Sequence, residues 1–192
     1  KQISQYQHYE IPAPGPDLKS EWRLSGFPDF GLYLVSSPRL FLAIRCGSVG
    51  QNGNGGHAHN DALAIEVQID GVDRIIDPGS YLYTPAPGIR NSYRSVKAHF
   101  APRLEDREPN PFGSNLFQLE DRARAECLYF GDKGFIGTHR GYGRPVYRRI
   151  QVLKDRLVIE DYFDGPETLV RLEPADPSPE VRISVGYGQQ WF

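Results

Sequence analysis

The chain has 192 residues, which fits a single domain and is long enough to bury a hydrophobic core. Its formal net charge of −2 gives no electrostatic case for binding nucleic acid or an anionic membrane. No apolar run approaches the roughly 20 residues that a membrane-spanning helix needs. The first ten residues lack the apolar core of a signal peptide, and methionine is absent throughout. We therefore expect a piece of a longer or processed polypeptide, with no membrane span.

Twenty glycines and 16 prolines favour many short strands joined by turns. Residues 1–25 are polar and interrupted by proline, so we expect a linker or an edge segment there. Alternating apolar residues and flanking turn residues then predict strands in the following segments: 31–37, 39–47, 61–69, 72–76, 116–119, 124–130, 135–142, 145–153 and 156–163. Residues 166–192 are expected to form a last strand and a tail.

This succession predicts an all-β fold, an antiparallel sandwich of two sheets over residues 26–165. Cys46 and Cys127 can form one disulfide or remain free thiols, and the sequence leaves both open. The Arg148-Arg149 pair is interpreted as a solvated strand edge rather than an anion site.

Two histidines stand two residues apart in GGHAHNDALA, residues 55–64. In an extended segment His57 and His59 would point to the same face and could address a metal ion, a substrate carboxylate or a proton in transit. Asp77 and His99 complete a set of imidazole and carboxylate groups that suits zinc. The alternative is that the histidines are ordinary loop residues and that Asp77-Pro78-Gly79 is only a turn. Spacing alone does not decide between them.

A shared site has a geometric condition. If Asp70-Gly71 is a two-residue hairpin turn, Asp77 pairs with Ala64, and His59 lies roughly 16 Å away along an ideal strand. The corner that begins at His59 must therefore curl back, or a bulge must shift the register.

The ordered motifs resemble a known family. The run GGHAHNDALAIEVQIDGVDRIIDPGSYLYT, then RNSYRS, then KAH, is similar to the C-terminal β-sandwich domain of heparinase II/III-like polysaccharide lyases. The resemblance covers about Gly26 to Gly165. A later His139 with Gly141 and Tyr142, followed by an arginine-bearing strand, also fits.

This resemblance implies that His59, Asp77 and His99 bind zinc and that His57 faces the substrate cleft and assists the chemistry. The chain departs from many members after His99, where Phe100-Ala101 replaces Asn-Thr, and the departure concerns the substrate loop more than the metal.

The implied reaction is β-elimination of a uronic-acid polysaccharide. A base removes the proton beside the sugar carboxylate, which must be neutralised to stabilise the carbanion. In the family the main tyrosine base and its partner sit in a separate helical toroid domain, N-terminal to the sandwich. The resemblance thus implies an acidic polysaccharide and a missing toroid domain as partners, an inactive isolated chain, and a periplasmic or extracellular location from the substrate class.

Tyr83, Tyr93 and Arg94 are candidate contacts for sugar or carboxylate, and His139 could line the cleft. A tyrosine or arginine near a strand end is more often a packing residue, and His139 can be an ordinary strand histidine.

Two other functions remain open: a carbohydrate-binding or structural module without turnover, and a cupin-type metal enzyme with two histidines and a carboxylate. Against the cupin-type enzyme, the first glutamate after the histidines is Glu66, seven residues past His59.

Overall fold

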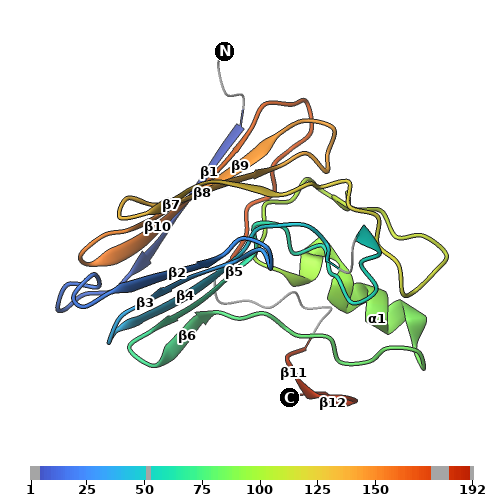
Figure 1. The fold of residues 1–192 in the computed structure, drawn as a ribbon, viewed down its shortest axis with the longest axis horizontal. Helices are drawn as coiled ribbons and strands as arrows, with labels where there is room; N and C mark the ends of the chain where they lie inside the picture. The colour runs from blue at the N-terminus through green and yellow to red at the C-terminus, as the bar shows by residue number, and fades with distance from the viewer. Residues whose placement is uncertain (1–4, 51–52, 174–181, 191–192) are drawn as a thin grey trace.

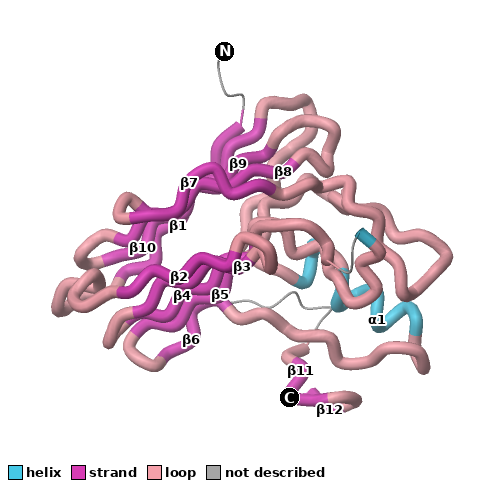
Figure 2. The backbone as a smooth tube through the Cα atoms, in the orientation of Figure 1, coloured by secondary structure: helices cyan, strands magenta, loops and turns pink. Residues whose placement is uncertain are grey.

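The computed structural model describes residues 5–50, 53–173 and 182–190. Within these residues the strands form two five-stranded antiparallel sheets and one small hairpin. The two large sheets lie face to face on one side of the molecule, and α1 gathers with the long loops on the other (Figure 1; Figure 2). The predicted antiparallel sandwich is confirmed.

The first sheet has the order β1-β10-β9-β8-β7. Its strands are β1 (Gln5–Pro12), β7 (Glu126–Gly131), β8 (Gly134–His139), β9 (Val146–Val152) and β10 (Arg156–Phe163). Four of them match predicted strands. The fifth, β1, lies at the sheet edge in the segment expected to be a linker or an edge segment.

The second sheet has the order β2-β3-β4-β5-β6. Its strands are β2 (Arg23–Phe27), β3 (Leu32–Ser36), β4 (Leu40–Arg45), β5 (Ile65–Ile69) and β6 (Val72–Ile75). The predicted strand at 116–119 is wrong: those residues form turns and coil, with only Leu119 buried. Three apolar residues in a window of only four are too short a run to outweigh the loop around them.

The core lies between the sheets because each inner face carries alternating apolar residues. Ile159 of β10 and Leu42 and Val67 of the second sheet are at most 1% exposed. Tyr33 joins the layers through edge contacts with Phe130 and a tilted contact with Phe135, at ring-centroid distances of 5.1 and 5.6 Å. Cys46 and Cys127 are both free thiols in the structure.

The Asp70-Gly71 turn joins β5 to β6 as predicted. Both residues have positive φ, 54° and 75°, the combination that a tight type I′ hairpin requires. The pairing starts as expected with Ile69 opposite Val72, and then shifts by one residue, so that Val67 pairs with Ile75. The chain also turns before β5, because Leu63 has a φ of 65°. The regular strand begins only at Ile65. Either feature was sufficient to allow a shared histidine site, and both are present.

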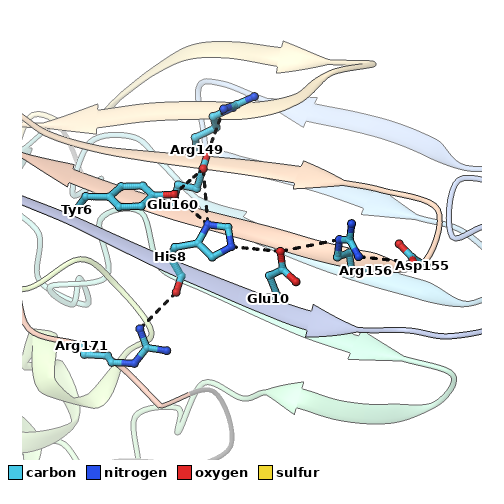
Figure 3. Close-up of polar contacts among 8 residues, drawn as sticks. All are labelled: Tyr6, His8, Glu10, Arg149, Asp155, Arg156, Glu160 and Arg171. Carbon is cyan, nitrogen blue, oxygen red and sulfur yellow. Dashed lines mark hydrogen bonds and ion pairs between the residues drawn. The ribbon is translucent and has the colours of Figure 1, made fainter.

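The predicted solvated edge at Arg148-Arg149 needs a correction for one residue. Arg149 lies on the outer face of β9 and pairs with Glu160, in a polar network that also holds His8 and Tyr6 (Figure 3). Arg148 points inward and is fully buried, because its guanidinium meets the Asp161 carboxylate through two hydrogen bonds of 2.7 Å. The fork geometry of arginine makes such a buried pair possible.

The remaining elements lie outside the sandwich. They are α1 (Pro87–Arg94), the 3-10 turn η2 (Val96–Ala98), and a hairpin of β11 (Ser184–Gly186) and β12 (Gln189–Gln190). The tail expected after residue 165 contributes this hairpin and one bridge between Leu104 and Leu169, while 174–181 lie outside the described residues. In the described part of the chain, no helix is long and apolar enough to cross a membrane.

Candidate functional site

Two long connections leave the second sheet at the same end. One runs from the end of β4 to the start of β5, and the other runs from the end of β6 to the start of β7. Because these strands are antiparallel neighbours, the three strand ends lie side by side. The connections carry His57 and His59 on one loop, and Asp77, α1 and His99 on the other. Topology therefore brings together residues that are 42 positions apart.

His99 and Asp77 form the centre of the group. The Nδ1 of His99 donates to Oδ2 of Asp77 at 2.5 Å, and the His99 side chain is 1% exposed. Burial alone would lower the pKa of His99, but the Asp77 carboxylate raises it above its ordinary value. In return, although burial favours the neutral carboxyl, the charge and hydrogen bond of His99 lower the pKa of Asp77. The other ring nitrogen of His99, Nε2, is buried without a hydrogen-bond partner.

His59 lies beside this pair. Its ring centroid is 5.3 Å from that of His99, and its Nε2 is 3.4 Å from the hydroxyl of Ser80. Burial, followed by the charge of His99, lowers the pKa of His59 to about 3, so its imidazole is neutral at physiological pH. The structure thus brings the three predicted zinc ligands together. In the described residues, however, no three His, Cys, Asp or Glu side chains form a preassembled metal site.

His57 does not share a face with His59. Residues 57–59 form turn and coil rather than a strand, and the His57 side chain is exposed. Its ring makes edge contacts with Tyr83 and Phe117, at centroid distances of 5.5 and 6.2 Å. The loop enters this position through Gly55, which has a φ of 61° and whose Cβ, if present, would lie 2.5 Å from the carbonyl oxygen of Leu119. The two histidines therefore have different neighbours.

Arg94 has a positioning role that the sequence did not indicate. It is 2% exposed, and its guanidinium donates to the carbonyls of Ala58 at 3.0 Å, Leu116 at 3.0 Å and Gln118 at 3.3 Å. It therefore ties the histidine loop to the 116–118 loop, and it does not reach the surface where a substrate would contact it.

Arg90 lies one helical turn before Arg94 on α1 and acts in the same way. It donates to the carbonyl of Gly56 at 2.8 Å and to that of Leu116. Its guanidinium also lies 4.6 Å from the ring centroid of Phe117 and 5.5 Å from that of Tyr83. Two arginines at i and i+4 in RNSYRS were the signal that could have predicted this clamp.

The two guanidinium groups leave a local excess of positive charge. No carboxylate of the described residues lies within ion-pair distance of Arg90 or Arg94, and Nε of Arg90 is buried without a partner. Burial, followed by the charge of Arg90, lowers the pKa of Arg94 to about 10, so Arg94 stays charged at neutral pH. Burial also lowers the pKa of Arg90. Buried arginines are rarely left without a counter-charge.

A second group of polar residues fixes the corner at residue 60. Asn60 is fully buried, its backbone N–H donates to the carbonyl of Arg94, and its amide donates to Glu108 at 2.7 Å. Glu108 also accepts hydrogen bonds from the hydroxyl of Ser95 at 2.5 Å and from the backbone N–H of Val96 at 2.9 Å. One carboxylate therefore joins the loop of His59 to the turn that leads to His99. No local pattern marks Glu108 in the sequence.

Two other candidate contacts are buried. His139 is 0% exposed, packs on the Tyr142 ring at 5.2 Å, and has a pKa lowered by burial to about 4. Tyr93 is 1% exposed, and its hydroxyl donates to the carbonyl of Arg182 at 2.7 Å. Neither lies at the surface beside His57, whereas Tyr83 does.

Comparison with known proteins agrees with the sandwich fold. The fold is a two-sheet antiparallel sandwich with a histidine-rich loop cluster at one end. The family model for the Heparinase II/III-like C-terminal domain matches residues 19–185. The chain therefore belongs to the Heparinase II/III-like family, and the match extends beyond the Gly26–Gly165 stretch of the resemblance.

Solved structures share the fold. A heparinase III gene product has 14% identity and a TM-score of 0.56, with 80% of this chain and 25% of that chain covered. A heparan sulfate lyase from Pedobacter heparinus has 16% identity and a TM-score of 0.56, with 75% of this chain and 22% of that chain covered. Another heparinase III structure has 12% identity and a TM-score of 0.57, with 78% of this chain and 25% of that chain covered. The chain thus spans about a quarter or less of the length of these proteins. Among curated proteins no sequence matches.

Proposed function

We propose that this chain is the sandwich domain of a polysaccharide lyase and contributes to β-elimination of uronic-acid-containing polysaccharide. The observation that carries the proposal is the exposed His57 ring beside two buried arginines that have no carboxylate partner among the described residues. A positive, rigidly held region suits an anionic substrate, because it attracts the sugar carboxylate and costs no reorganisation when charge develops.

His57 is the residue assigned to the substrate. Its ring is exposed, and the loop that carries it is held by Arg90 and Arg94 through the carbonyls of Gly56 and Ala58. An imidazole in this position can donate a hydrogen bond to the substrate carboxylate or transfer a proton. Either action stabilises the carbanion that β-elimination requires. Tyr83, in edge contact with His57, is assigned to sugar binding.

Zinc binding by His59, Asp77 and His99 is the second part of the proposal. The donor chemistry fits, since His59 is neutral, Asp77 is ionised, and the Nε2 of His99 is buried without a partner. Bound zinc would supply a fixed positive charge and hold the corner on which His57 stands. The hydrogen bond between His99 and Asp77 would be exchanged for metal coordination.

The third part concerns the rest of the polypeptide. Because related structures are roughly three times as long, we infer a parent protein with an N-terminal helical toroid domain that carries the main base. The isolated chain would then bind substrate without turnover. For the parent protein, the alternative function is a carbohydrate-binding module that binds the polysaccharide without turnover. No finding favours the cupin-type alternative.

Metal content tests the zinc assignment. Elemental analysis of the purified chain, expressed with zinc, should give about one zinc per chain, and His59→Ala should lose it. His8→Ala is the matched control, because His8 lies in the surface network of β1 and away from the site (Figure 3). A metal-free wild-type chain, with His59→Ala equally stable, would exclude the site.

Turnover tests the catalytic assignment. In the full-length parent, His57→Ala should keep zinc and fold but lose roughly 10²- to 10⁴-fold in rate, measured as ultraviolet absorbance of the unsaturated product. His8→Ala should keep full activity. Turnover by the 192-residue chain alone would show that the base does not lie in a separate domain. A parent that binds uronate polymers without turnover would support the non-catalytic alternative.

A further inference from the structure

The hairpin of β11 and β12 places a tyrosine beside the candidate site. The ring of Tyr187, at the hairpin turn, stacks on that of Tyr83 with a centroid distance of 6.0 Å and an interplanar angle of 13°. Tyr187 is 62% exposed. It also lies beyond residues 19–185, the range that the family model matches. The feature is therefore one that the family assignment does not explain.

Tyr187 extends a continuous strip of aromatic rings. Tyr83 contacts His57, and His57 contacts Phe117, which is 39% exposed. Arg90 lies behind the strip, against both Tyr83 and Phe117. We call these four rings, of Tyr187, Tyr83, His57 and Phe117, the aromatic strip.

The hairpin holds Tyr187 in place. Gln190 donates to the hydroxyl of Tyr93 at 2.5 Å, and the backbone N–H of Gly188 donates to the carbonyl of Tyr81 at 2.9 Å. On the other strand, the hydroxyl of Ser184 accepts from the N–H of Tyr81 at 3.1 Å. Since the anchors come from both strands, the ring does not have to be ordered when a ligand binds, which reduces the entropic cost of binding.

The composition of the strip points to one class of ligand. Exposed aromatic rings gathered in one place indicate a binding surface, and a flat ring can cover the C–H face of a sugar ring and bury its apolar area. The arginine charges behind the strip add attraction for an anion. A neutral sugar or a purely apolar partner would use only one of these two features.

We propose that Tyr187, Tyr83 and Phe117 form a stacking surface that binds consecutive sugar rings of an acidic polysaccharide on both sides of His57. This rests on the proposed function for its ligand class, and it adds a subsite on the C-terminal hairpin. Tyr187 is a binding residue here, not a catalytic one, because its ring lies on Tyr83 rather than on His57.

Calorimetric binding of the 192-residue chain to hyaluronan, heparan sulfate and neutral dextran tests the surface. Tyr187→Ala and Phe117→Ala should each raise the Kd for the acidic polymer roughly 2- to 12-fold. The controls are Tyr147→Ala and Phe41→Ala, two other exposed rings, 37% and 44%, on strands β9 and β4. Both controls should bind as the wild type does. Unchanged melting temperatures check that each variant is folded.

Salt separates the two contributions. Raising the salt concentration should weaken binding of every variant, because it screens the arginine charges, while the ratio of Tyr187→Ala to wild type should stay the same. If Tyr187→Ala bound an acidic polymer with the affinity of the wild type, this inference would be overturned and the proposed function would stay intact. Equal affinity for dextran would overturn the acidic ligand class, and no binding of any acidic polymer would overturn the proposed function itself.

Discussion

Glu108 offers a direct test of how the site is held together, since its carboxylate accepts three hydrogen bonds from two different segments. Glu108→Ala removes the acceptors of the Asn60 amide, the Ser95 hydroxyl and the Val96 N–H, at 2.7, 2.5 and 2.9 Å. Hydrogen bonds to a charged group contribute about 1.5–3 kcal/mol each.

The expected loss of stability is smaller than the full sum. Glu108 is only half buried, so water can replace part of the acceptor, and the Asn60 amide keeps its second bond, to the carbonyl of Asn110 at 2.9 Å. We therefore expect Glu108→Ala to lower the free energy of unfolding by about 2–4 kcal/mol. Because Asn60 follows His59 and Val96 begins the turn to His99, Glu108→Ala should also weaken zinc binding at the proposed site.

Urea unfolding at pH 7 measures the first effect, with an unchanged dependence on denaturant showing that only stability has changed. The control is Glu105→Ala, an exposed glutamate in the same loop, which should lie within about 0.5 kcal/mol of the wild type. Glu108→Gln keeps the size of the side chain but has only one acceptor oxygen. Its free energy of unfolding should therefore lie between those of Glu108→Ala and Glu105→Ala. A Glu108→Ala protein as stable as the Glu105→Ala control would refute the reasoning.

Three other substitutions give defined outcomes. Asp161→Ala leaves the buried Arg148 without its carboxylate and should cost about 3–5 kcal/mol in thermal or urea unfolding, whereas Asp155→Ala, at an exposed position before the same strand, should cost little. Equal costs would contradict the burial of the pair. His139 has a folded pKa of about 4 against 6.5 for the ordinary imidazole, so below pH 6.5 the unfolded chain binds a proton that the folded chain does not. Stability should therefore fall as pH drops from 6.5 to 4, and His139→Leu should remove up to about 3 kcal/mol of that fall; identical pH profiles would exclude a buried neutral His139. Arg94→Lys keeps the charge but cannot bridge three carbonyls, so it should raise the hydrogen-exchange rates of residues 56–60, and unchanged rates would argue against the clamp.

Local patterns in the sequence were sufficient for the sheets. Strands β3 to β6 and β7 to β10 follow from alternation and turn residues, because side-chain direction in a strand depends only on the position of a residue relative to its neighbours. The Asp70-Gly71 turn follows from its own chemistry, since glycine and aspartate tolerate the positive φ values that it needs. The ordered motifs around His59, Asp77 and His99 carried the resemblance that led to the family.

The tertiary structure decided what each polar side chain contacts. Arg94 and Arg148 look alike in the sequence, yet one binds loop carbonyls and the other a buried carboxylate. His57 and His59 have different neighbours because residues 57–59 form turn and coil before β5 rather than an extended strand. Glu108 and Tyr187 reach the site from segments that carry no motif. Burial and pairing across tens of residues depend on how the sheets and loops pack. Neither the periodicity of apolar residues nor the spacing of motifs contains that information.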